Sequence, residues 1–102
     1  MTHTLILRPE AEEDLRDAYR WYDERVPGLG LRFLESVEQT LGRIEHSPQL
    51  YAEVHEGVRR ALISTFPYGV YYITEDERSV VVAVVRSSRH PRLWMARTRP
   101  AT

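Results

Sequence analysis

The run Val80–Val85 constrains the fold of this chain more than any other segment. It consists of five valines and one alanine. Because β-branched side chains favour strands, the run predicts a strand over about residues 79–86. Two further segments of this kind, about residues 58–65 and 68–74, come shortly before it. Connections this short predict that the three strands form an antiparallel meander.

The first half of the chain predicts one strand and two helices. Residues 4–7 are a short apolar segment typical of a strand. Pro9 suits the first turn of a helix, and the acidic residues after it suit the positive end of the helix dipole. Apolar residues recur every three or four positions from Ala11 to Val26 and again over about residues 30–46. The short link between these helices predicts an antiparallel hairpin.

This element order predicts one α+β domain over residues 1–102. An N-terminal strand, a helical hairpin and a C-terminal three-stranded antiparallel meander would place the helices on one face of the sheet. A chain of 102 residues leaves no room for a second domain. We expect a core over about residues 4–86, with a loop over residues 49–57 and a basic, polar tail over residues 87–102.

Composition narrows the classes of function. The chain has no cysteine, which excludes disulfides and thiolate zinc sites. His3, His46 and His55 lack metal-ligand spacing, so we expect neither a metal site nor a cofactor. The longest apolar run is far shorter than the ~20 residues that span a bilayer. The N-terminus lacks the charged region of a signal peptide. We therefore expect a cytoplasmic protein without a membrane partner.

Charge is distributed unevenly along the chain. Residues 1–56 carry 12 acidic residues and 6 arginines, a net charge of -6, whereas residues 57–102 carry 3 acidic residues and 8 arginines, a net charge of +5. This division predicts either a basic face for an acidic partner or arginines that pair with helix acids inside the fold. Lysine is absent, so the cations are guanidinium groups that hold phosphate or carboxylate well but transfer protons poorly.

The segment after the valine run is the strongest functional candidate. We predict that it binds the target of this protein through the following residues: Arg86, Arg89, His90, Arg92, Trp94 and Arg97. Trp94 also has a structural interpretation, in which its ring closes the edge of the core. A general nucleic-acid-binding module stays open as well, with arginines on phosphates and Trp94 stacked on a base, although such domains are usually basic overall.

An ordered set of short motifs extends through nearly the whole chain. It comprises Pro9-Glu10-Ala11 with Asp14-Leu15, Trp21-Tyr22, Leu29-Gly30 with Phe33, Ile44 with Pro48, Arg59-Arg60, Phe66-Pro67-Tyr68, Tyr72, Ala83-Val84, and Arg89-His90-Pro91 with Trp94. In this order and spacing the set resembles the RelE/ParE superfamily, the toxin subunits of bacterial type II toxin–antitoxin modules. The resemblance covers residues 5–97 and implies the same α+β fold.

The resemblance implies a growth inhibitor that is silenced by a cognate antitoxin, and it offers two targets. RelE-like members are ribosome-dependent RNases that cut messenger RNA, and here the candidate nuclease residues are Arg59, Arg60, Arg86 and His90. ParE-like members lack the basic catalytic cluster and are generally poisons of DNA gyrase.

Three features of the chain favour the gyrase branch. Lysines are absent, Arg86 stands where many members have a histidine, and we expect no carboxylate near the end of the last strand. We therefore predict a gyrase inhibitor rather than an enzyme. An inert relative that only binds its antitoxin is the remaining alternative.

The resemblance also implies where the antitoxin binds. We expect it to lie against the helical hairpin and the last strands, where it would contact Trp21, Tyr22, Tyr68 and Tyr72. Aromatic residues at helical spacing usually pack in a core, and because Tyr68, Tyr71 and Tyr72 alternate faces of a strand, at least one should lie beneath the helices. For the same reason the adjacent Arg59 and Arg60 should point to opposite faces of the sheet.

Overall fold

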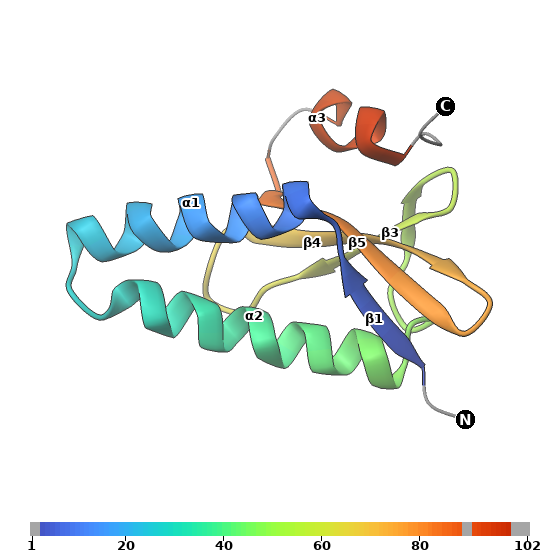
Figure 1. Cartoon of the computed structure of the whole chain (residues 1–102), viewed down its shortest axis with the longest axis horizontal. Coiled ribbons are helices and arrows are strands. Elements are labelled where there is room, and N and C mark those ends of the chain that lie inside the picture. The colour runs from blue at the N-terminus through green and yellow to red at the C-terminus, as the bar shows by residue number, and fades with distance from the viewer. Residues whose placement is uncertain (1–2, 89–90, 99–102) are drawn as a thin grey trace.

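The computed structural model describes residues 3–88 and 91–98 (Figure 1). The elements in chain order are β1 (Thr4–Leu7), α1 (Pro9–Arg25), α2 (Leu29–His46), β2 (Glu53–His55), β3 (Val58–Leu62), β4 (Tyr68–Glu75), β5 (Arg78–Arg86), α3 (Arg92–Met95) and the 3₁₀ turn η1 (Ala96–Thr98). Figure 1 shows α1 and α2 side by side as the predicted hairpin, with the short α3 apart from it. The predicted α+β class and element order are confirmed.

The strands form one sheet in the order β1-β5-β4-β3-β2. The predicted antiparallel meander is confirmed as β3, β4 and β5. β1 pairs with β5 in parallel, from Thr4 opposite Arg78 to Leu7 opposite Val81. This pairing gives Val80 and Val81, at the start of the valine run, a strand on each side.

Each face of β5 packs in a different core. Val81 and Val84 lie in the core beneath α1 and α2, with Phe33 and Tyr72. Val80, Val82, Ala83 and Val85 lie in the core on the other face, which Trp94 covers. The alternation is broken once, because Tyr71 pairs with Ala83 and Tyr72 with Val81, so that Val82 is the extra residue of a bulge. The valine run is therefore buried on both faces.

Two predictions about segments outside the main elements need correction. The loop expected over residues 49–57 contains β2, a polar edge strand of 3 residues that is too short to give a periodic signal. The polar tail expected over residues 87–102 is wrong for residues 92–98, which fold as α3 and η1 because Trp94 is buried against the sheet. Residues 89–90 and 99–102 lie outside the described part of the chain.

The helical hairpin depends on the close approach of its two helices at Gly30. A Cβ atom at this position would lie 2.7 Å from the carbonyl oxygen of Tyr19 on α1. Asp23 closes the turn, because its carboxylate accepts hydrogen bonds from the backbone N–H groups of Gly28 and Gly30. The helices can pack this closely only because residue 30 has no side chain.

We expect Gly30→Ala to lower the free energy of unfolding by about 2 kcal/mol, because the added methyl group forces α1 and α2 apart. Gly42→Ala is the matched control on the same helix, since nothing lies within 4 Å of its added Cβ atom. This control should stabilise the protein by about 0.5–1 kcal/mol through helix propensity alone. Urea denaturation of both variants measures the difference, and equal stabilities would contradict the close packing at Gly30.

Candidate functional site

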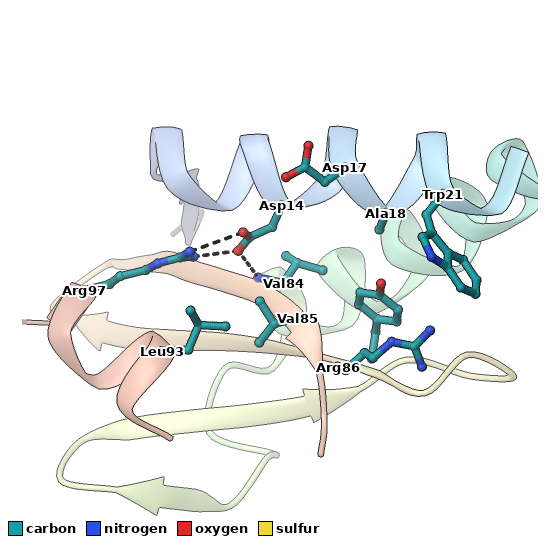
Figure 2. Close-up of a pocket in the computed structure, with 10 residues that line it drawn as sticks. Asp14, Asp17, Ala18, Trp21, Val84, Val85, Arg86, Leu93 and Arg97 are labelled. Atoms are coloured by element: carbon teal, nitrogen blue, oxygen red, sulfur yellow. Dashed lines mark hydrogen bonds and ion pairs between the residues drawn. The ribbon is translucent and has the colours of Figure 1, made fainter. Parts of the chain in front are cut away.

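A pocket of about 310 Å³ lies between α1 and the end of β5 (Figure 2). Its wall on α1 consists of Asp14, Asp17, Ala18 and Trp21. Asp17 and Ala18 each lie three or four positions from both Asp14 and Trp21, so the four residues share one face of the helix. The remaining lining residues come from the sheet, α3 and η1 and are Tyr68, Val84, Val85, Arg86, Leu93 and Arg97.

One end of the pocket holds an ion pair between α1 and the C-terminal segment. Nη1 of Arg97 lies 2.6 Å from Oδ2 of Asp14, and the two side chains are only 20% and 13% exposed. The same carboxylate oxygen accepts a hydrogen bond of 3.0 Å from the backbone N–H of Val84. Nη1 of Arg97 also donates to the carbonyl oxygen of Val82 at 3.2 Å. Asp14 and Arg97 thus pair with each other and with the edge of β5.

These contacts exist because β1 is shorter than β5. The pairing of β1 with β5 ends at Leu7, and a hydrogen bond from the backbone N–H of Arg8 to Val81 completes it. Beyond that point the edge of β5 has no neighbouring strand, and its buried backbone groups need other partners. Side chains from α1 and η1 supply them.

The structure changes the interpretation of two residues in the C-terminal segment. Trp94 is 3% exposed and stacks on Tyr71 with ring centroids 4.9 Å apart. Its ring therefore closes the edge of the core, which is the structural one of its two predicted roles, and does not face solvent. The Arg97 guanidinium pairs with Asp14 of α1. For this arginine, the uneven charge of the sequence reflects pairing with a helix acid inside the fold. The expectation that no carboxylate lies near the end of the last strand is wrong, because α1 brings Asp14 there.

Arg86 occupies the other end of the pocket. Its guanidinium carbon lies 5.2 Å from the centroid of the Trp21 ring and 5.6 Å from that of Tyr68. Arg25 also lies over the Trp21 ring, at 3.6 Å, and donates a hydrogen bond to the carbonyl oxygen of Trp21. Within residues 3–88 and 91–98, no hydrogen bond or ion pair involves the Arg86 guanidinium. Its edge is therefore available to an external anion.

The candidate nuclease residues that the structure describes, Arg59, Arg60 and Arg86, do not come together. Arg59 and Arg60 point to opposite faces of the sheet, as predicted, since they pair with Tyr72 and Tyr71, which lie in different cores. Arg59 is occupied by Gln49, to which it donates at 2.9 Å, and by the carbonyl oxygen of Tyr51.

Arg86 is also distant from Arg59 along the sheet. Arg59 lies opposite Tyr72 and Arg86 opposite Tyr68, which separates the two arginines by roughly 13 Å along β4 alone. Two of the predicted target-binding residues, Arg89 and His90, lie outside the residues that the structure describes. Arg92 lies exposed on α3.

The four residues predicted to bind an antitoxin divide into two groups. Trp21 is 40% exposed and Tyr68 is half-buried, and both line the pocket. Tyr22 and Tyr72 are buried in the core beneath the helices, which confirms that at least one tyrosine of β4 packs there. Tyr72 donates a hydrogen bond of 2.8 Å to the carbonyl oxygen of Pro48, and burial raises its pKa to about 12. Only Trp21 and Tyr68 can contact a partner without unfolding the core.

The sequence patterns did not predict Asp14, Asp17 and Arg25 as site residues. A signal was present for Asp14, because it stands beside the apolar stripe of α1 that includes Ala11 and Ala18. In the described part of the chain, no group of three or more His, Asp or Glu side chains is arranged to hold a metal ion. None of the helices in that part is both long and apolar enough to cross a membrane.

Comparisons with known proteins agree on the kind of protein. The family model described as ParE toxin of type II toxin-antitoxin system, parDE, matches residues 5–91. Toxin ParE2 of Mycobacterium tuberculosis is 28% identical over 92 residues, which cover 89% of this chain and 88% of that protein. The structure of the chromosomal ParDE system from P. aeruginosa has a TM-score of 0.75 at 16% identity, over 83% of this chain and 96% of that chain.

A second solved structure has the same fold. A mutant of the E. coli toxin RelE in the free state has a TM-score of 0.65 at 16% identity, over 86% of each chain. The two structural matches together show the RelE/ParE-like fold.

We expect Asp14→Asn to lower the free energy of unfolding by about 2–3 kcal/mol, because it removes the charge that pairs with the mostly buried Arg97. The amide oxygen can still accept the hydrogen bond from Val84, whereas the charge and the acceptor for Nη2 of Arg97 are lost. Glu13→Gln is the control, since Glu13 pairs with Arg16 in solvent and should change nothing measurable. Chemical denaturation of both variants tests this, and a stability of Asp14→Asn equal to that of the control would contradict it.

Tyr72 should make the protein less stable at alkaline pH. Its pKa rises from 10.0 to about 12 in the folded chain, so the unfolded chain ionises first. The stabilisation is complete below pH 10 and is lost as the pH rises towards 12. In Tyr72→Phe the free energy of unfolding should therefore fall less steeply over this range. A profile of Tyr72→Phe identical to that of the wild type would refute the assignment.

Proposed function

The chain belongs to the ParE toxin family of type II toxin–antitoxin systems, and we propose that it inhibits growth by poisoning DNA gyrase in the cytoplasm until a cognate antitoxin binds it. The observation that supports gyrase over RNA cleavage is the separation of the candidate nuclease residues. Arg59 and Arg60 point to opposite faces of the sheet, and Arg86 lies at the far end of β4 from Arg59.

RNA cleavage places stricter demands on a site than gyrase poisoning does. It needs a base for the 2′-hydroxyl, cations for the phosphate and an acid for the leaving oxygen, all within reach of one phosphodiester. Arginine supplies the cations but is a poor base or acid. Poisoning by binding needs only a stable surface with the right charge, and the Arg86 end of the pocket offers such a surface.

The antitoxin follows from membership of a two-component family. The P. aeruginosa protein that shares the fold belongs to a ParDE toxin–antitoxin system. We expect this chain to form a hetero-oligomer with its own antitoxin, with Trp21 and Tyr68 as the contact residues that remain accessible.

Expression of the chain alone in a bacterial host tests the target. We expect early induction of the DNA-damage response and filamentous cells while incorporation of labelled amino acids continues, because a gyrase poison damages DNA before it affects translation. An immediate stop of translation with cleaved messenger RNA would instead identify the RelE-like activity, for which the structural likeness to E. coli RelE is the supporting observation.

Variants at two arginines locate the target surface. Arg86→Ala should reduce inhibition of purified gyrase by about tenfold or more, as expected for an arginine at the centre of an interface. Arg78→Ala is the matched control on the same strand, because Arg78 is exposed and its ion pair is with Glu75, at the opposite end of β5 from Arg86. Trp94 is unsuitable for such a test, since replacing a buried aromatic ring costs about 3–5 kcal/mol of stability. Full inhibition by a folded Arg86→Ala protein would exclude Arg86 from the target surface.

A further inference from the structure

The two edges of the sheet differ in how they are protected against pairing with another chain. Both edge strands are short, but β2 also carries the charged Glu53, and its pairing with β3 shifts at a bulge. Charged side chains and bulges are the usual protection of a sheet edge. β1 has neither, because its four residues are uncharged and its pairing with β5 runs without a shift. The β1 edge is therefore suited to receive a further strand.

The backbone groups of Leu5 and Leu7 point away from the sheet. The N–H groups of Thr4 and Arg8 donate to carbonyl oxygens on or next to β5. Because backbone groups alternate in direction along a strand, those of Leu5 and Leu7 face outwards. β1 is the outermost strand on its side of the sheet (Figure 1), so these groups have no neighbouring strand within residues 3–88 and 91–98.

We propose that the β1 edge joins two copies of this chain into a symmetric dimer. When two β1 strands pair antiparallel about Ile6, Leu5 of each copy lies opposite Leu7 of the other. These are the residues whose backbone groups face outwards, so each such pair exchanges both of its hydrogen bonds. One surface patch then serves both copies, as a twofold axis requires. The proposal is independent of the target of the toxin.

Ile6 gives this pairing an apolar centre. Its side chain is 38% exposed and lies on the opposite face of β1 from Leu5 and Leu7, which pack against the core beneath the helices. In the dimer the two Ile6 residues form a pair without mutual hydrogen bonds, in which the Cα atoms approach to roughly 4.5 Å. β-branched side chains placed this closely pack on each other. The dimer thus buries apolar surface that a single copy leaves in water.

An acidic hollow of about 470 Å³ lies beside the start of β1. It is lined by Thr4, Ile6 and the turn of residues 75–78 between β4 and β5. Three acidic residues and one arginine give this turn a net charge of -2. Arg78 pairs with Glu75. The other two acids, Asp76 and Glu77, form no ion pair in the described part of the chain. The hollow is therefore suited to receive a cation.

Arg8 supplies the opposite charge at the other end of β1. Its backbone is still extended, so its side chain shares the face of Ile6, and its guanidinium donates to one carbonyl oxygen of η1. In the dimer, Arg8 of each copy lies opposite Thr4 of the other, beside the acidic hollow. Glu10 and Glu12 follow Arg8 on α1, which packs on the other face of the sheet. The same attraction therefore acts at both ends of the paired strands.

Sedimentation of the purified chain over a series of concentrations tests the proposal. An interface built around two short strands is small, so we expect a dimer with a Kd of about 1–100 μM. Ile6→Lys should raise this Kd at least about tenfold, because it places like charges directly opposite each other. Leu31→Lys is the matched control and should leave the Kd unchanged. Leu31 is also exposed and apolar, but it lies in the first turn of α2, at the end of the hairpin that is remote from β1 (Figure 1).

Reversal of two charges then tests the register. Arg8→Glu and Glu77→Arg should each weaken the dimer, and the chain that carries both changes should recover most of the affinity. Within one copy, Glu77 accepts the backbone hydrogen bond from Thr4, so it lies about 13 Å from Arg8 along β1. Recovery can therefore come only from contact between copies. Melting temperatures check that the variants are folded, and Glu77→Arg alone, in an exposed turn, stays informative if Arg8→Glu unfolds the chain.

Three results would overturn the proposal. The first is a chain that stays monomeric up to about 1 mM. The second is a dimer that Ile6→Lys and Leu31→Lys affect equally, since its interface would then lie elsewhere. The third comes from hydrogen exchange, in which the N–H groups of Leu5 and Leu7 should become protected as the concentration of the chain rises. Protection that appears only when the antitoxin is added would assign the β1 edge to another chain.

Discussion

The arrangement of this molecule depends on how it satisfies the edge of β5 beyond the end of β1. β1 stops at Leu7, while β5 continues to Arg86. Buried backbone groups without partners cost free energy comparable to a lost hydrogen bond. Asp14 and Arg97 provide these partners and bind each other as well. This small cluster fixes α1 along the sheet and holds the C-terminal segment in place.

The same cluster explains why the pocket has two chemically different ends. At one end Arg97 is committed to structure through Asp14. At the other end Arg86 has aromatic neighbours, and within the described residues it forms no ion pair with a carboxylate. The uneven charge of the sequence allowed either internal ion pairs or a basic surface. The first interpretation describes Arg97, and the second describes Arg86. The charge of the C-terminal half therefore has to be interpreted for each arginine separately.

The likeness to known proteins extends to the fold but not to the side chains of the pocket. Structures at 16% identity share the fold with TM-scores of 0.75 and 0.65. Identity this low leaves few side chains in common, so what persists is the order of elements and the pattern of apolar positions. The side chains that line the pocket are free to differ within such a fold. They must be interpreted from this chain itself.

The sequence by itself determined the elements and their order, because periodicity and turn residues act over short distances. The strand at Thr4–Leu7, both helices and the three-stranded meander follow from such local patterns. It also determined that Arg59 and Arg60 face opposite sides, since alternation is a property of any strand. Short polar β2 gave no such signal, and neither did the helix that carries Trp94.

Only the tertiary structure decided which arginine is structural and which is available. Asp14 and Arg97 are 83 residues apart in the chain, and Trp21 and Arg86 come from different elements. Contacts over such separations depend on where β1 ends and on how α1 crosses the sheet. No local pattern encodes these distances, because they arise from the packing of the whole sheet against the helices.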